Sequence, residues 1–110
     1  MRDKLKTYLD KFVEVVGTFK RYGTKRSYNG TPITTVLLVD IHTLEGEYLT
    51  DHQWFVNIHG FDKLGQLRYG DKIAFNAKCE GYAKGEQYRE FGHPREWDYE
   101  LLYPSNIRKI

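Results

Sequence analysis

Cysteine is almost absent from this chain of 110 residues, which contains only Cys79. A single cysteine cannot form a disulfide within the chain, and it cannot supply the thiolate cluster of a structural metal site. Cys79 also falls in phase with the apolar residues of its segment, so we expect a buried thiol with a structural role. The sequence therefore predicts no disulfide framework and fits a protein of the reducing cytoplasm.

Long apolar runs and a large excess of one charge are missing as well. No stretch approaches the ~20 apolar residues of a membrane-spanning helix, and the N-terminus does not resemble a signal peptide. We therefore expect a cytoplasmic protein without a membrane partner. The net charge is only +2, which by itself does not indicate a polyanionic partner.

Motifs of known catalytic sites are also missing. The chain has no glycine-rich phosphate loop, no serine nucleophile elbow and no paired-cysteine motif. Asp40 and His42 share a face of one predicted strand, and His42 could pair with His52 across strands. A role for His52 as partner of a buried carboxylate or backbone group is the simpler interpretation. We expect no enzyme, no cofactor and no metal site, since the four histidines lie on separate predicted elements: His42, His52, His59 and His93.

What the chain does contain is a strong β pattern and an aromatic content of 15%. After the turn signal Gly70-Asp71, apolar residues occupy every second position from Ile73 to Cys79. A period of two predicts a strand with one buried and one solvated face. Gly81 then interrupts the pattern, as a bulge would. The segment 60–67 before it has room for one or two helical turns.

The remaining segments extend this pattern to a complete small domain. Residues 1–11 have the apolar spacing of a short amphipathic helix. A polar loop over 23–31 ends in the turn signal Asn29-Gly30. The five strands are predicted at 12–22, 33–41, 48–58, 73–82 and 97–103. For their core we expect Val15, Leu38, Phe55, Ile73, Phe75 and Leu101.

The predicted order is strand-strand-strand-helix-strand-strand, with a helix in front. This is the order of the OB-fold, a five-stranded Greek-key barrel. We therefore predict a mainly β, single-domain protein, with an N-terminal helix at 1–11 and an OB-fold barrel at 12–110. A short helix lies between the third and fourth strands of this prediction.

Several segments carry a closer resemblance to a known group of proteins. They are Thr50–Phe55, Gly60–Leu64, Gly70–Tyr82, Asp98–Leu101 and Pro104–Ile107. In these segments the chain resembles small OB-like proteins encoded by phages and mobile elements of Gram-positive bacteria. The whole run from Phe12 onward is similar to OB-folds of the kind that bind single-stranded nucleic acid. The resemblance implies such a fold and such a ligand.

A basic and aromatic segment from Phe19 to Tyr28 supports the same ligand. It contains four cations and three aromatic residues but no acid. Single-stranded nucleic acid needs cations along its phosphates and flat rings under its bases. In OB-folds this segment falls beside the binding cleft, as does the loop 83–96. The predicted binding residues are Lys20, Arg21, Tyr22, Lys25, Arg26, Tyr28, Trp54, Lys84, Tyr88, Arg89 and Phe91.

Other interpretations of the same residues stay open. A loop rich in lysine and arginine is often a solvated hairpin, Phe19 fits the core, and Tyr22 and Tyr28 could pack locally. We expect both tyrosines to be exposed if they stack bases. The predicted partner is single-stranded DNA or RNA, with DNA favoured. The alternative is a protein-interaction OB module of a phage or mobile element without a nucleic-acid role, and an oligomer is possible.

Overall fold

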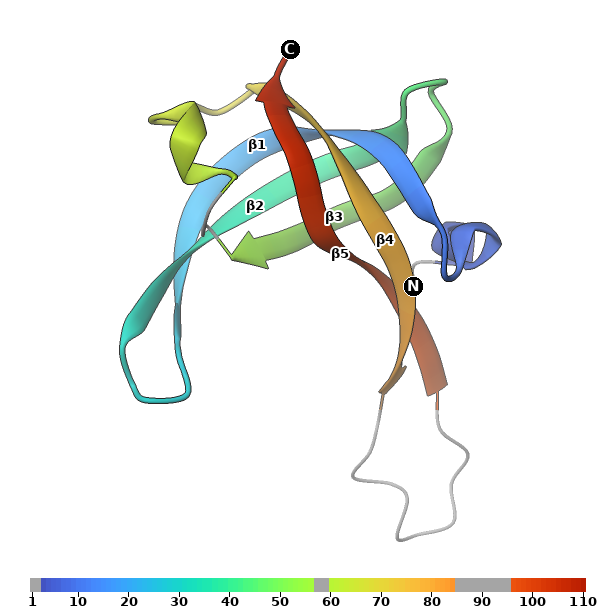
Figure 1. Ribbon diagram of the computed structural model, residues 1–110, viewed down its shortest axis with the longest axis horizontal. Helices are drawn as coiled ribbons and strands as arrows, with labels where there is room; N and C mark the ends of the chain where they lie inside the picture. Colours follow the sequence, from blue (N-terminus) through green and yellow to red (C-terminus); the bar gives the residue numbers. More distant parts are fainter. Residues whose placement is uncertain (1–2, 57–59, 85–95) are drawn as a thin grey trace, which may run out of the picture.

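The computed structural model describes residues 3–56, 60–84 and 96–110. These residues form one antiparallel sheet with strand order β3-β2-β1-β4-β5 (Figure 1). The predicted mainly β class and five strands are confirmed. The strands are β1 (Phe12–Arg26), β2 (Pro32–Thr43), β3 (Tyr48–Val56), β4 (Lys72–Lys84) and β5 (Glu96–Lys109).

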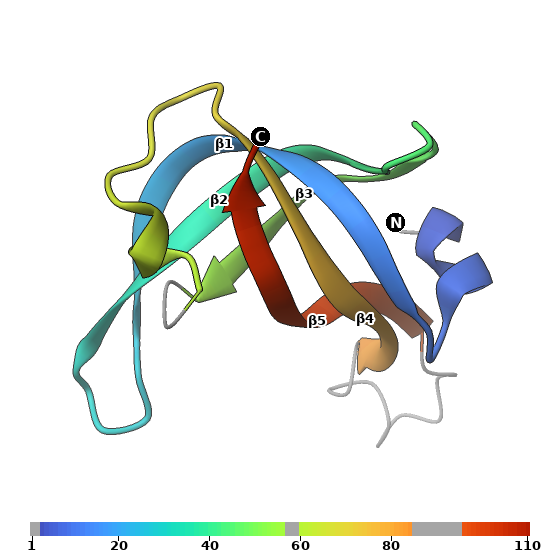
Figure 2. The same ribbon diagram turned by 45° about the horizontal axis from the view of Figure 1, so that its top comes forward.

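The sheet curls so strongly that its two edge strands, β3 and β5, approach each other (Figures 1 and 2). Within the described residues, no ladder of backbone hydrogen bonds joins β3 to β5. The side chain of Gln53 in β3 instead bonds the backbone of Leu101 in β5. The described part of the chain is therefore a curled, open sheet, and the closed barrel of the sequence prediction is not observed.

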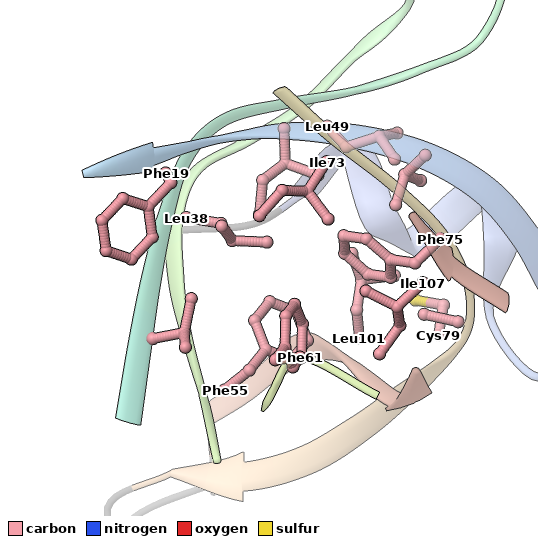
Figure 3. Packing of buried hydrophobic residues seen from close by; sticks show 14 of the residues in the cluster. Phe19, Leu38, Leu49, Phe55, Phe61, Ile73, Phe75, Cys79, Leu101 and Ile107 are labelled. Carbon is pink, nitrogen blue, oxygen red and sulfur yellow. The ribbon is translucent and has the colours of Figure 1, made fainter. Parts of the chain in front are cut away.

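The core lies on the concave side of this sheet (Figure 3). Phe61, from the segment that joins β3 to β4, packs there against Phe55 and Phe75, with ring centroids 5.7 and 6.1 Å away. Such tilted and edge-on ring pairs are favoured by the ring quadrupoles. All six side chains that the sequence predicts for the core are buried: Val15, Leu38, Phe55, Ile73, Phe75 and Leu101.

The two predicted helices are only short 3₁₀ segments. η1 spans Asp3–Tyr8 and η2 spans Asp62–Leu64. Both are held by buried apolar side chains at or beside them, Leu5 in η1 and Phe61 next to η2. Three residues cannot complete an α-helical turn and its hydrogen bonds, so η2 stays at the tighter geometry. In the described part of the chain, no helix is long and apolar enough to span a membrane.

Two strands are longer than their sequence patterns predict. β1 continues to Arg26, so the first four residues of the predicted loop 23–31 are strand, and 27–31 make the turn. The end of β1 is strand because it pairs with β2, whose β-branched residues Ile33 and Thr34 lie opposite Lys25 and Thr24. β5 likewise continues past Pro104 to Lys109.

Candidate nucleic-acid interface

The outward face of β1, β2 and β3 carries the candidate site. Side chains of paired residues point to the same side of an antiparallel sheet. The sheet register therefore places basic residues of β1 beside an exposed tryptophan of β3. The rows across the three strands are Arg21–Leu37–Trp54, Gly23–Thr35–Val56 and Lys25–Ile33.

Trp54 lies across this face over a glycine of β1. A Cβ atom on Gly23 would lie 2.6 Å from Cζ3 of Trp54 and 2.9 Å from Oγ1 of Thr35, which is too close for any real side chain. The indole therefore occupies the space that a larger residue at Gly23 would fill. Leu37, although it faces outward, is only 7% exposed, because Arg21 and Trp54 flank it in its row.

Arg21 places a positive charge beside the ring of Trp54. Its Cζ atom lies 4.9 Å from the centroid of the Trp54 ring, within the range of a cation–π contact. The pair forms a flat, cationic surface, and Trp54 remains 40% exposed. Among the described residues, no carboxylate pairs with the four exposed cations of β1: Lys20, Arg21, Lys25 and Arg26.

A pocket of about 470 Å³ adjoins this surface, between the edges of β3 and β5. Lys25 and Trp54 line it from the outward face, and Tyr103 and Pro104 line it from β5. The pocket therefore continues the aromatic and basic surface toward the seam of the sheet. Its other lining residues are Gln53, Phe55, Val56, Glu100, Leu101 and Leu102.

The two tyrosines of the predicted site differ in position. Tyr28 is fully exposed at the tip of the β1–β2 hairpin, as expected. Tyr22 is half-buried, so the expectation that it is exposed is wrong. Its ring packs edge-on against Phe19, with centroids 4.8 Å apart, and its hydroxyl accepts a hydrogen bond from the Leu67 N–H at 2.9 Å. Phe19 itself is buried, in agreement with its core interpretation.

The second predicted binding segment, loop 83–96, is mostly outside the described residues. Tyr88, Arg89 and Phe91 lie there, and for Lys84 at the end of β4 the side chain is likewise not described. The contribution of these four residues stays a prediction. The described part of the candidate interface therefore consists of residues from β1, β2, β3 and β5.

The histidine pairing considered from the sequence does not form. His42 is paired with Tyr48 in the sheet, and His52 with Val39. The Nδ1 atom of His42 lies 2.9 Å from the carbonyl oxygen of Asp40, whose left-handed backbone (φ 53°) breaks the alternation of the strand. In the ranges that the structure describes, no group of three or more His, Cys, Asp or Glu residues could hold a metal ion.

Cys79 is buried, as the sequence predicts. Its thiol donates a hydrogen bond to the Leu5 carbonyl of η1, with Sγ 3.0 Å from the oxygen. Burial, together with the charges of Asp10 and Glu80, raises the pKa of the thiol to about 11. The thiol is therefore neutral at physiological pH and serves to hold η1 on β4.

Some residues of this surface carry a signal that the sequence interpretation missed. Gln53 lies two positions before the buried Phe55, so strand alternation alone places it on the inner face. Gly23 stands in a strand, where a glycine often marks close approach of another group.

No protein-family model, curated protein or solved structure matches this chain. Its function therefore has to be inferred from the geometry of this face.

Proposed function

We propose that the protein binds single-stranded nucleic acid, with DNA favoured, across the outward face of β1, β2 and β3. The observation that carries this proposal is the Arg21 guanidinium over the exposed ring of Trp54. Indole and guanidinium planes both stack unpaired bases, and neighbouring cations bind the phosphates between them. Lys25, four residues from Arg21 on the same face of β1, supplies such a cation.

The chemistry of the face favours a single strand over a duplex. A flat ring on a sheet surface can contact only bases that are not already stacked in a helix. The small net charge of the whole chain is not an obstacle, because it is the local density of cations that attracts a polyanion. The cations of β1 have this density without an acid partner among the described residues.

The order of the strands supports an OB-type architecture for this binding face. The order β3-β2-β1-β4-β5 is the one that closes into an OB-fold barrel when β3 and β5 become neighbours. In our proposal the molecule is such a Greek-key barrel, opened between β3 and β5. It is then related in fold to the small OB-like proteins of Gram-positive phages and mobile elements that the sequence resembles.

Fluorescence anisotropy with labelled oligo-dT and oligo-U, at two salt concentrations, tests the proposed binding. Lys25→Gln should remove about one phosphate contact, and Arg21→Gln should remove one cation beside the bound strand, so in each variant the slope of log K against log salt should shrink by roughly 0.7. Trp54→Ala should weaken binding by about 1–3 kcal/mol, because it removes a stacked ring.

Lys63→Gln in η2 is the matched control, because Lys63 is exposed and lies outside the interface. It should leave both affinity and salt slope unchanged. Duplex DNA of the same sequence should bind more weakly than the single strand. Wild-type affinity and slope in all three interface variants would refute binding at this face.

A second function, protein binding, is favoured by a different surface. A groove of about 440 Å³ between η1, β1 and the β2–β3 turn contains Phe12 and Leu44, which are 67% and 50% exposed. Glu14, Glu45 and Glu47 also line it. Exposed apolar anchors within a polar rim are typical of protein interfaces, and the acidic rim favours a basic partner.

Capture of partners from a nuclease-treated lysate tests this second function. A partner held in the groove should survive the nuclease and be lost with Phe12→Ser. Tyr69→Ser, at an exposed tyrosine outside the groove, is the control. Loss of every partner on nuclease treatment would rule out the groove as a protein-binding site.

A further inference from the structure

A buried glutamine sets the width of the seam between β3 and β5. Nε2 of Gln53 donates to the Leu101 carbonyl oxygen at 2.6 Å, and the Leu101 N–H donates to Oε1 of Gln53 at 3.0 Å. The side-chain amide thus takes the place that a peptide group of a neighbouring strand would have. Because a side chain stands between the two backbones, the strand edges are held apart here instead of forming a ladder.

The pocket described above lies along this seam. Its volume of about 470 Å³ is in the range of sites that enclose small ligands. Three aromatic residues line it, Trp54 and Phe55 from β3 and Tyr103 from β5, and its charged lining residues are Lys25 and Glu100. The pocket therefore combines flat rings with a cation, and these suit a planar heterocycle that carries a phosphate.

Tyr103 has an unusual backbone. Its φ is 56°, in the left-handed region that is unfavourable for residues with bulky side chains. The ring gains no burial in return, since it is 63% exposed and lies outside the core cluster. This backbone belongs to a bulge of β5, in which Tyr103 and Pro104 stand between Leu102 and Ser105, the partners of Lys78 and Asn76. Bulges re-aim side chains and are frequent beside functional sites, so an exposed tyrosine in a bulge that lines a pocket points to a binding role.

We propose that this pocket is a subsite for one unstacked base of the bound strand, with Tyr103 as its stacking platform. The inference rests on the proposed function and extends it from the outward face to the seam. The strand would run from Arg21 over Trp54 into the pocket, with Lys25 on the phosphate beside the held base. A peptide added to a strand edge is disfavoured, because an edge-bound strand has no need of the paired rings or the cation.

Substitution of Tyr103 tests the subsite by anisotropy with oligo-dT. Tyr103→Ala should weaken binding about 5- to 150-fold, the range for the loss of one stacked base. Tyr103→Phe retains the ring and should bind like the wild type. Tyr69→Ala, which removes another exposed tyrosine outside the pocket, should also bind like the wild type. An oligonucleotide that carries 2-aminopurine should lose fluorescence on binding to wild type, and less so on binding to Tyr103→Ala.

Tyr103→Gly separates binding from folding. Glycine adopts positive φ without strain, so the melting temperature should not fall while the affinity falls as in Tyr103→Ala. Wild-type affinity in both variants, with weaker binding of Arg21→Gln and Lys25→Gln, would overturn the subsite and leave the proposed function intact. Absence of oligonucleotide binding by the wild type would overturn both. Loss of a nuclease-resistant protein partner in Tyr103→Ala, with unchanged oligonucleotide affinity, would assign the seam to a protein and also overturn the subsite.

Discussion

Gly23 and Trp54 make the outward face flat. The indole can lie across β2 and reach β1 only because the residue below it has no side chain. A flat, partly exposed ring with Arg21 beside it is then available to a ligand. At the scale of single residues, the flat shape of the candidate interface therefore depends on a glycine that has no side chain of its own.

Gly23→Ala is predicted to destabilise the fold by about 1–3 kcal/mol, because the new methyl group overpacks the site and displaces the indole. Denaturant unfolding measures the loss, and a change in tryptophan emission reports the displaced ring. Gly81→Ala in β4 is the matched control, since its Cβ would meet no described atom closer than 3.6 Å. Equal stability of the two variants would mean that Trp54 does not rest on Gly23.

At the scale of elements, the sequence predicts strands well where alternation is strong and poorly where cross-strand partners decide. The burial of Ile73, Phe75, Ala77 and Cys79 in β4 follows from the period of two, although Ala74, which is out of phase, is buried as well. The end of β1 does not, because Gly23, Lys25 and Arg26 are typical of a loop and become strand only through pairing with β2. The residue types of this segment do not show that it will pair with β2.

In the candidate site, too, residue types predict some features, and the folded structure decides others. The cluster of cations and the tryptophan could be found from the sequence, because residue type alone indicates them. The inward direction of Tyr22 could not, since two bulges in β1 change which side chains face the core. The left-handed backbone of Tyr103 was equally hidden, because a tyrosine rarely adopts it.

Tyr22 links β1 to the segment before β4, and its substitution should affect stability without affecting binding. Tyr22→Phe removes the acceptor of the Leu67 N–H and should cost about 1–3 kcal/mol if that group stays buried without a partner. Tyr22→Ala should cost more, since it also removes the contact with Phe19. Urea unfolding and anisotropy with oligo-dT measure the two effects. Weaker binding by a Tyr22→Phe protein of unchanged stability would instead mean that the Tyr22 hydroxyl takes part in binding the oligonucleotide.

At the scale of the whole molecule, the open seam joins the core to the proposed binding surface. Phe55 belongs to the core cluster and also lines the pocket, and the buried Gln53, which joins β3 to Leu101 of β5, lines the pocket as well. Because a side chain, and not a ladder, bridges β3 and β5, room is left for the pocket between the two strand edges. The two hydrogen bonds between Gln53 and Leu101 also keep the edges of β3 and β5 from separating, so the pocket is accessible while the two strands stay joined.

Gln53→Leu keeps most of the side-chain volume but removes both hydrogen bonds to Leu101. The buried N–H and C=O of Leu101 then lose their partner, so stability should fall by about 1–3 kcal/mol, and by less if water from the pocket reaches them. Amide hydrogen exchange locates the effect, since the Leu101 amide should exchange faster while amides in the β1–β4 ladder stay protected.

Gln53→Glu is a second probe of the same two hydrogen bonds. Its carboxylate can still accept from the Leu101 N–H but, when ionised, cannot donate to the carbonyl, so protection should be partly kept. Full protection of the Leu101 amide in Gln53→Leu would mean that a backbone group of β3 can replace the side chain, and that the seam closes without Gln53.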